Sequence, residues 1–424
     1  MDSLQLLRTR QRFLMVAGSI LAASWALTSR IEAQEWTRFR GPNGSGLSES
    51  KAIPTDWTQQ NIRWRVALPG EGHSAPVVWG RKIFLTGTPA DGSAFEVYCL
   101  DSEEGQLLWK KSYPYRGFPK HRFNSFASPT PVVDSDRVYV VWAVPDQLQV
   151  AALTQEGRES WVKPLGPFSS QHGVGASPIL HEGRLIVVND QDGPSSILGL
   201  DASTGRTVWE TKRVSGKTSY STPCLFNHPT GVTWLICNSD TNGITALDAK
   251  TGATVWSYGE AFDKRSVSSP FVAGGLVFGS CGSGGGGNFL IAVEPPSFPG
   301  GLPKKRYELK RSAPYVPTSV ALGNRLFTWS DAGVVSCLEL SSGKVLWQER
   351  VGGNFFGSPV MIGGRLFCVS DTGEVAVVSA SDRFQLLARN SLHESSNSTP
   401  AVAGDRLFVR TLKHLVCVGT PSVK

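Results

Sequence analysis

The sequence predicts an all-β fold, an eight-bladed propeller built from four-stranded antiparallel blades. Two observations predict it: a repeat with a period near 45 residues, and short β-branched and aromatic runs separated by Asn, Asp and Gly turns. Successive repeats begin 41 to 53 residues apart, which is the length of one blade. Each begins at a residue followed by proline, and the eight prolines are Pro76, Pro129, Pro178, Pro223, Pro270, Pro317, Pro359 and Pro400.

The fourth repeat illustrates the four strands of a blade. After Pro223 come a first strand and then a second one over 232–237, and a polar turn over 240–243 follows. The third strand covers 244–247, and a second turn over 248–252 leads into a last strand that ends in Trp256. Asn, Asp and Gly at the turns and β-branched or aromatic residues between them are typical of β-hairpins.

The second turn carries the sharpest signature of the repeat, Leu-Asp-x-x-x-Gly-x-x-x-Trp, as in Leu247, Asp248, Gly252 and Trp256. The Asp side chain can accept hydrogen bonds from backbone N–H groups within the turn, and Gly tolerates a positive φ. The Trp then lies on the outer strand, where its ring can dock on the next blade. The predicted docking tryptophans are Trp64, Trp109, Trp161, Trp209, Trp256 and Trp347.

With these tryptophan motifs, the chain resembles the PQQ-like propeller repeats of the quinoprotein alcohol dehydrogenase-like superfamily. The resemblance covers residues 61–418. It is nearest to the noncatalytic BamB-type branch, whose familiar member is an outer-membrane assembly scaffold. A second motif, Trp36 to Gly46 in the leader, is similar to the opening of exported bacterial propeller proteins of this type.

The ends of the repeat region predict how the ring closes. The eighth repeat stops near Val418, before its outer strand, whereas residues 61–66 read as an outer strand with no blade before it. We therefore expect the N-terminal strand to complete the last blade and leave no open sheet edge. Because repeats five and seven are degenerate, seven blades plus an irregular tail is the alternative.

The N-terminus predicts export from the cytoplasm. Arg8, Arg10 and Arg12 precede an uncharged stretch over 13–28, and small residues follow, which is the order of a signal peptide. A retained signal anchor is the alternative. The predicted organisation is a signal peptide over 1–33, a Gly/Pro-rich leader over 34–60, one propeller domain over 61–418 and a short tail over 419–424. The predicted location of the mature chain is the periplasm or cell envelope of a bacterium.

The charge of the chain excludes few partners. The formal net charge is +7, and it falls to +5 without residues 1–33, which carry four basic and two acidic residues. The sequence shows neither an Arg/Lys-rich helix nor a stacked aromatic platform beside this positive charge, so we expect no nucleic-acid partner. We expect envelope protein partners and a monomeric chain, and the charge leaves peripheral association with a membrane open.

The seven cysteines do not form a disulfide framework in the sequence. Cys99, Cys337 and Cys417 share one repeat position that other repeats fill with Gly or Ala, which indicates a small buried slot. Cys224 and Cys237, on neighbouring strands, are the one pair whose disulfide state stays open. The sequence has no adjacent cysteine pair and no metal-type Cys/His spacing.

These features bear on cofactor chemistry. The resemblance to quinone-dependent dehydrogenases would imply a vicinal disulfide, a calcium ion held by Glu and Asn, and an Asp base, and none of these can be placed on residues of this chain. We therefore expect no catalytic residue, no metal and no cofactor, with PQQ and calcium as the alternative.

A ligand is predicted to bind on the face where the loops that enter each innermost strand surround the central channel. A ring of polar and aromatic side chains there could hold a peptide or a sugar. The candidates are His73, Arg122, Asn124, His172, Tyr220, Arg265, Tyr315, Phe355 and Asn397.

A long entry loop over 113–123 interleaves aromatic residues with cations, a composition favoured at protein interfaces. Tyr115, Arg116 and Phe118 are its predicted partner-binding residues. The Gly-rich segment 280–287 is interpreted as a mobile loop rather than a phosphate cradle, because no strand-to-helix context follows it.

Together these features predict an exported, noncatalytic propeller that acts as a protein-binding scaffold in the bacterial cell envelope. A PQQ-dependent oxidoreductase and a carbohydrate-binding or carbohydrate-degrading module are the alternatives. An acidic pair beside an aromatic cleft would have favoured a glycosidase, and none is evident in the sequence.

Overall fold

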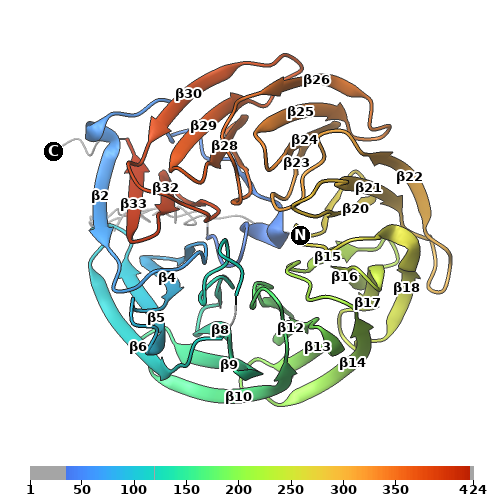
Figure 1. The fold of residues 1–424 in the computed structure, drawn as a ribbon, viewed down its shortest axis with the longest axis horizontal. Helices are drawn as coiled ribbons and strands as arrows, with labels where there is room; N and C mark the ends of the chain where they lie inside the picture. Colours follow the sequence, from blue (N-terminus) through green and yellow to red (C-terminus); the bar gives the residue numbers. More distant parts are fainter. Residues whose placement is uncertain (1–34, 119, 421–424) are drawn as a thin grey trace, which may run out of the picture. The chain divides into compact units, whose positions relative to one another are not determined.

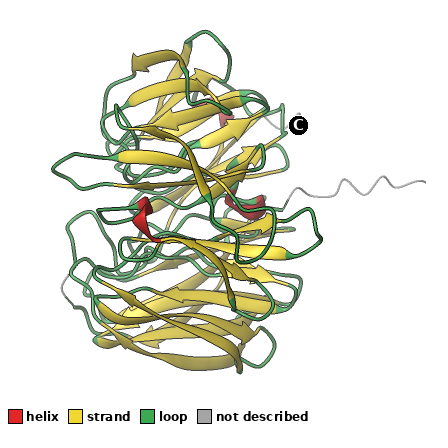
Figure 2. Ribbon diagram, turned by 90° about the vertical axis from the view of Figure 1, so that its right-hand side faces the viewer, coloured by secondary structure: helices red, strands yellow, loops and turns green. Residues whose placement is uncertain are grey.

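The computed structural model describes residues 35–118 and 120–420, which form a ring of eight blades (Figure 1). The predicted signal peptide over 1–33 lies outside the described residues, as do Gln34, Pro119 and most of the predicted tail. Seen from the side, the blades present loops on both faces of the ring (Figure 2). No helix in the described part of the chain has the length and apolar character needed to cross a membrane.

Each blade is an antiparallel sheet whose first strand faces the channel and whose fourth strand lies at the rim. Blades 1 and 2 contain β3 (Val77–Trp79), β4 (Lys82–Gly87), β5 (Ala94–Asp101), β6 (Leu107–Pro114), β7 (Val132–Val133), β8 (Arg137–Val144), β9 (Asp146–Thr154) and β10 (Glu159–Phe168). Blades 3 and 4 contain β11 (Ile179–His181), β12 (Arg184–Asn189), β13 (Gly193–Asp201), β14 (Thr207–Ser215), β15 (Cys224–Asn227), β16 (Thr233–Ser239), β17 (Gly243–Asp248) and β18 (Thr254–Tyr258).

The remaining blades follow the same order. Blades 5 and 6 contain β19 (Phe271–Ala273), β20 (Leu276–Cys281), β21 (Phe289–Glu294), β22 (Lys304–Leu309), β23 (Val320–Leu322), β24 (Arg325–Trp329), β25 (Val334–Glu339) and β26 (Val345–Arg350). Blades 7 and 8 contain β27 (Val360–Ile362), β28 (Arg365–Val369), β29 (Glu374–Ser379), β30 (Leu386–Ser391), β31 (Ala401–Ala403), β32 (Arg406–Arg410), β33 (His414–Gly419) and β2 (Ile62–Ala67). The short elements outside the blades are η1 (Pro42–Gly44), β1 (Leu47–Ser48), η2 (Gln59–Asn61) and η3 (Gly259–Ala261).

The predicted closure of the ring is confirmed. β2 pairs antiparallel with β33, with Trp64 opposite Cys417, so the N-terminal strand is the outer strand of blade 8. Eight complete blades are present and the seven-blade alternative is wrong. The segment that leads into blade 1 thereby completes blade 8, so the two ends of the propeller are held together within one sheet and β33 is not left as an unpaired edge.

The recurring Ser/Thr beside proline has a structural purpose that the sequence did not reveal. In seven places a buried backbone N–H at the start of one blade donates to the Ser or Thr hydroxyl at the same position of the next blade, at 2.9–3.1 Å. The hydroxyls thus link the innermost parts of all eight blades in one series. The donors are Ala75, Thr130, Ser177, Thr222, Ser269, Thr318 and Ser358.

We expect Ser269→Ala to lower the free energy of unfolding by about 1–3 kcal/mol, because it leaves the buried N–H of Thr222 without its acceptor. Urea unfolding followed by tryptophan fluorescence measures this change. Ser297→Ala, at an exposed position of the β21–β22 loop, is the matched control and should change the free energy by less than about 0.5 kcal/mol. Equal stability of the two variants would contradict a role for the hydroxyl series.

Four of the six predicted docking tryptophans contact the next blade at its turn glycine. The rings of Trp64, Trp109, Trp161 and Trp209 lie against the turn glycine of the following blade, so close that a Cβ on Gly252 would lie 2.4 Å from Trp209. The indole of Trp109 also donates to the carbonyl of Gln155 in the next blade at 2.9 Å. Opposite each ring, on the third strand of its own blade, lies the predicted small slot, with Cys99 facing Trp109 and Gly199 facing Trp209.

Blade 5 continues the pattern with a tyrosine. Its third strand ends at Glu294, and after the Pro-rich excursion β22 places Tyr307 opposite Ala292. The Tyr307 ring contacts the turn glycine of blade 6, Gly343, and its hydroxyl donates to the carbonyl of Leu340 at 2.8 Å. An aromatic ring with a polar tip can therefore replace the docking tryptophan.

Candidate functional site

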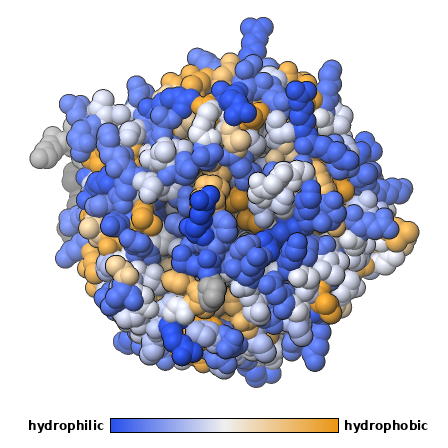
Figure 3. Space-filling model, in the orientation of Figure 1, coloured by the Kyte–Doolittle hydropathy of each residue, from blue (hydrophilic) through white to orange (hydrophobic). Residues whose placement is uncertain are grey.

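A cavity of about 1120 Å³ lies at the channel face of the ring, where the loops entering successive blades converge. Eight of the nine candidate binding residues line it: His73, Arg122, Asn124, His172, Tyr220, Arg265, Tyr315 and Asn397. Sequence reasoning thus placed eight of the nine candidates on one face, because each lies in an entry loop of its repeat. The face shown in Figure 3 is mainly hydrophilic, with scattered apolar side chains.

Phe355 is a correction. Its side chain is 1% exposed and packs edge-on against Trp329 in the core of blades 6 and 7. The next residue, Phe356, lines the cavity instead. Because adjacent residues of an extended segment point in opposite directions, an error of one position exchanges a core residue for a binding residue.

The predicted partner loop is also corrected. Tyr115 is 9% exposed and Phe118 is half-buried, and both rings pack with Phe126. Only Arg116 of the three predicted residues is exposed. The loop uses its aromatic residues to build a small core of its own, so the surface that it offers is mainly cationic.

Phe123, from the same loop, is 40% exposed and stacks on Phe356 with 4.6 Å between the ring centroids. These residues come from the entry loops of blades 2 and 7. Arg122 lies over the Phe123 ring at 4.5 Å. Sequence reasoning missed this aromatic pair, because nothing local predicts that loops so far apart in the chain meet.

The leader fills the central channel beneath this cavity, which the sequence analysis did not predict. Trp36 is fully buried and bridges to Val78 of blade 1, and Phe39 forms part of the cavity wall. Two blades away around the ring, β1 pairs in parallel with β27 of blade 7. The leader therefore belongs to the propeller unit and connects its blades from within (Figure 1, blue segment at the centre).

Arg40 connects the leader to the surrounding blades through its guanidinium. Its fully buried guanidinium donates to five carbonyl oxygens, those of Gly44, Ser45, Thr318, Ser319 and Pro359, at 2.8–3.3 Å. Burial lowers the pKa of Arg40 to about 9. Arg38 is similarly buried and donates to the carbonyl of Pro223 at 2.6 Å. The repeated proline segments thus present carbonyl groups to the channel, and the arginines of the leader satisfy them.

The cavity is rich in cationic side chains. Besides the predicted Arg122 and Arg265, its lining contains four lysines and arginines that the sequence analysis did not select: Lys217, Lys264, Lys310 and Arg350. Lys217 and Lys264 lie in the same entry loops as Tyr220 and Arg265, so their closeness to predicted residues was the available signal. Lys264 donates to the backbone carbonyls of Gly286 and Gly287.

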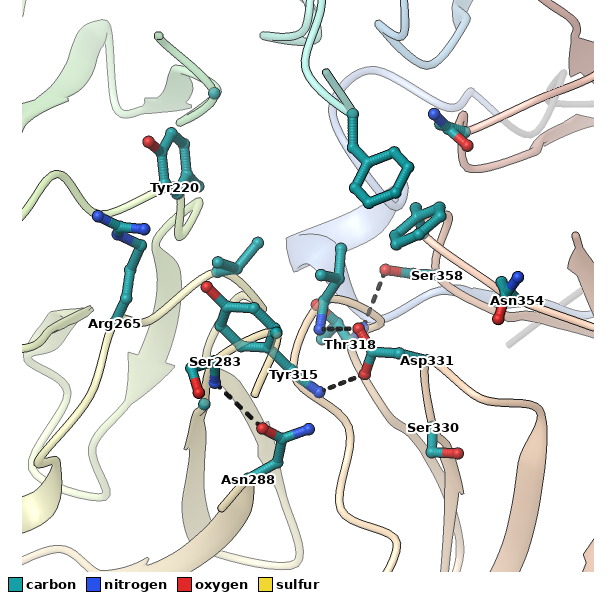
Figure 4. Close-up of a pocket in the computed structure, with 18 of the residues that line it drawn as sticks. Tyr220, Arg265, Ser283, Asn288, Tyr315, Thr318, Ser330, Asp331, Asn354 and Ser358 are labelled. Carbon is teal, nitrogen blue, oxygen red and sulfur yellow. Dashed lines mark hydrogen bonds between the residues drawn. The ribbon is translucent and has the colours of Figure 1, made fainter. Parts of the chain in front are cut away.

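The two carboxylates of the lining have backbone or amide partners. Asp331 accepts from the backbone N–H groups of Tyr315 and Val316 at 2.7 and 3.0 Å (Figure 4). Burial raises the pKa of Asp331. Asp371 accepts from the side-chain amide of Asn354 at 3.2 Å. These acids therefore serve first to hold the entry loops in place.

The Gly-rich segment forms one wall of the cavity. Asn288 accepts from the Ser283 N–H at 3.1 Å, and the Ser283 hydroxyl donates to the Gly286 carbonyl at 3.0 Å, so the loop is folded on itself (Figure 4). The loop thus has a defined conformation beside Lys264 and contributes to the lining.

His73 and His172 differ in environment. Burial at the rim, with Arg410 nearby, lowers the pKa of His73 to about 4. Burial and then the charge of Arg265 lower the pKa of His172. The rings of His172 and His121 meet edge-on at 4.9 Å.

The pKa of His73 predicts a pH dependence of stability. The folded chain holds this histidine neutral, whereas the unfolded chain binds a proton near pH 6.5, so stability falls as the pH decreases from 6.5 towards 4. We expect the loss to be about 2 kcal/mol, reduced by the partial exposure of the ring. Unfolding curves at pH 7, 5.5 and 4.5 measure it. His73→Gln should flatten the dependence, while His393→Gln at an exposed position should not; identical slopes would contradict the assignment.

The seven cysteines are buried and free, which includes Cys224 and Cys237. Within the described ranges, His, Cys, Asp and Glu side chains do not gather into a group of three that could hold a metal ion. The described lining of the cavity contains no Glu, and its Asp331 accepts from two backbone N–H groups.

The model of the family described as outer membrane protein assembly factor BamB matches residues 93–293 and 308–420. The chain belongs to this family. Among curated proteins, none matches the chain significantly. This BamB-family propeller is similar to BamB from Moraxella catarrhalis, with a TM-score of 0.61 and 17% identity over 86% of this chain and 98% of the other.

Two quinoprotein structures share the fold to a similar degree. A europium-containing methanol dehydrogenase has a TM-score of 0.64 and 12% identity, over 91% of this chain and 89% of that enzyme. The quinohemoprotein alcohol dehydrogenase from Comamonas testosteroni has a TM-score of 0.66 and 12% identity, over 92% and 81%. At such low identity, the three likenesses concern the fold alone.

Proposed function

We propose that this BamB-family propeller is a noncatalytic, protein-binding scaffold of the bacterial cell envelope. The observation that carries the proposal is the cavity of about 1120 Å³ at the channel face, whose wall is assembled from the entry loops of several blades and whose floor is the chain's own leader. A site of this size, built from loops on a rigid ring, suits a peptide segment of a partner. The signal-peptide pattern of residues 1–33 and the family support the envelope as its location.

Photocrosslinking tests the proposal. A photoreactive amino acid at Phe123, on the cavity rim, should yield covalent adducts with one recurring envelope protein in intact cells. The same probe at Leu302, which is 83% exposed in the β21–β22 loop, is the matched control and should not yield that adduct. Adducts from neither position, or the same adducts from both, would contradict a partner site at the cavity.

An oxidoreductase that uses PQQ is the second candidate, and the structural likeness to two quinoprotein dehydrogenases is what favours it. Calorimetric titration of the purified chain with PQQ and Ca²⁺ separates the two functions. Stoichiometric, calcium-dependent binding together with dye reduction in the presence of an alcohol would replace the scaffold proposal. A carbohydrate module, the other alternative, would be indicated by binding of neutral oligosaccharides at the cavity.

A further inference from the structure

The cavity has an excess of uncompensated positive charge. Five of its lining cations have no carboxylate at salt-bridge distance among the described residues, namely Arg122, Lys217, Lys264, Arg265 and Arg350. Lys310, the sixth, pairs with Glu308 at 3.5 Å. Since the two lining carboxylates are held by N–H groups, the field in the cavity favours an anionic ligand.

One of these cations, Arg265, lies beside two aromatic hydroxyls. Arg265 lies near Tyr220 and Tyr315 (Figure 4). Burial raises the pKa of both tyrosines, and the positive charge of Arg265 opposes this rise. The guanidinium donates to the Gln171 side-chain carbonyl at 3.4 Å and also interacts with the Tyr315 side chain. A carboxylate placed here could accept from Arg265 and from a tyrosine hydroxyl together, with Lys264 and Lys217 lining the same cavity.

The leader shows that the channel accepts an extended peptide. Its residues 47–48 pair in parallel with β27, and the Met361 N–H donates to the Gly46 carbonyl at 2.7 Å. The Asn43 side chain mimics a neighbouring strand, because it bonds both the N–H and the carbonyl of Leu225 at 2.8 Å. β27 and β15 are the innermost strands of their blades, and the leader adds to their channel-facing edges as a further strand or strand-like segment.

From these two features we infer that the cavity binds an extended acidic segment of the partner protein, whose carboxylates are held by Arg265, Lys264 and Lys217. The inference rests on the proposed function and adds the chemistry of the partner. The cations select negative charge, and the proposed protein-binding role makes a polypeptide rather than an acidic polysaccharide the expected ligand.

Fluorescence anisotropy with synthetic peptides tests the inference. The probe is a fluorescein-labelled 12-residue peptide of alternating Glu and Thr, compared with the same peptide in which Gln replaces every Glu. We expect the acidic peptide to bind at least about tenfold more tightly than the neutral one, and to weaken as salt rises because exposed charge pairs are screened. Equal affinities of the two peptides would overturn the inference.

Charge removal inside and outside the cavity supplies the matched comparison. The variant Lys217→Gln, Lys264→Gln, Arg265→Gln should bind the acidic peptide at least about tenfold more weakly. The control Lys304→Gln, Lys305→Gln, Arg306→Gln removes three exposed cations from β22 and the same net charge, and should change the affinity less than about twofold. Thermal unfolding of both verifies that they fold, and Lys217→Gln alone keeps the test decisive if the triple variant does not.

Two outcomes separate this inference from the scaffold proposal. If Phe123 crosslinks a partner in cells while the acidic peptide does not bind, the inference fails and the scaffold proposal stands. If an oligogalacturonate of equal charge competes as well as unlabelled acidic peptide, the site recognises polyanions in general and the peptide assignment is overturned.

Discussion

Replacing Arg40 with methionine is expected to lower the free energy of unfolding by about 3 kcal/mol, one of the two largest effects predicted for a single side chain. The guanidinium is the sole donor that the structure shows joining the leader to the carbonyls of Thr318, Ser319 and Pro359. Without it, these buried acceptors lose their charged partner. The loss is partly offset because methionine does not carry a charge into the interior. Urea unfolding followed by tryptophan fluorescence measures the change.

Two further variants give this experiment its comparison. Arg40→Lys keeps the charge but has fewer, unforked donors, so it should recover only part of the lost stability. Arg311→Met removes an exposed arginine and should alter the free energy by less than about 0.5 kcal/mol. If Arg40→Met were as stable as the Arg311 variant, the leader would not brace the ring.

Trp209→Ala should cost about 3–5 kcal/mol, the range for truncating a large buried aromatic side chain. The Trp209 ring is 8% exposed, lies against Gly252 of the next blade and covers Gly199 of its own. Its removal leaves a gap between blades 3 and 4 that the rigid hairpins on either side cannot close. The free energy of unfolding is again the measured quantity.

Val208, the neighbouring residue on β14, is 38% exposed and provides the control. Val208→Ala changes the same strand without opening the contact between the blades, so the expected loss is below about 0.5 kcal/mol. A comparable loss in both variants would show that the strand itself is sensitive and that docking on Gly252 is not the cause.

The candidate site was only partly predictable. Equivalent repeat positions indicated that His172, Tyr220 and Arg265 share one face, and the structure places them around one cavity. Repeat position misplaced Phe355 and loop composition misplaced Tyr115, because neither shows whether a loop side chain points towards the channel or into the blade. Side-chain direction in an irregular loop depends on the space left by neighbouring loops.

Two features of the interior could not be predicted from the repeat. The sequence analysis described the leader only as a Gly/Pro-rich segment before the propeller, yet it occupies the channel and Arg40 binds carbonyl groups of other blades there. Tyr307 was not predicted as a docking residue, because a Pro-rich segment separates it from the third strand of its blade. It nevertheless docks on Gly343 as a tryptophan would. In both cases the partner residues are far away in the sequence and belong to other blades.

The sequence by itself determined the blade count, the closure of the ring by residues 62–67 and the positions of the docking tryptophans. Those features depend on local, repeated signals: a turn that needs glycine, a slot that needs a small residue and an outer strand with no blade of its own. Only the tertiary structure decided that the leader closes the channel, and that Arg265, Lys264 and Lys217 face one cavity. The burial of a residue and the electrostatic potential near the axis of the ring depend on side chains from several blades. These side chains come together only when the ring is closed.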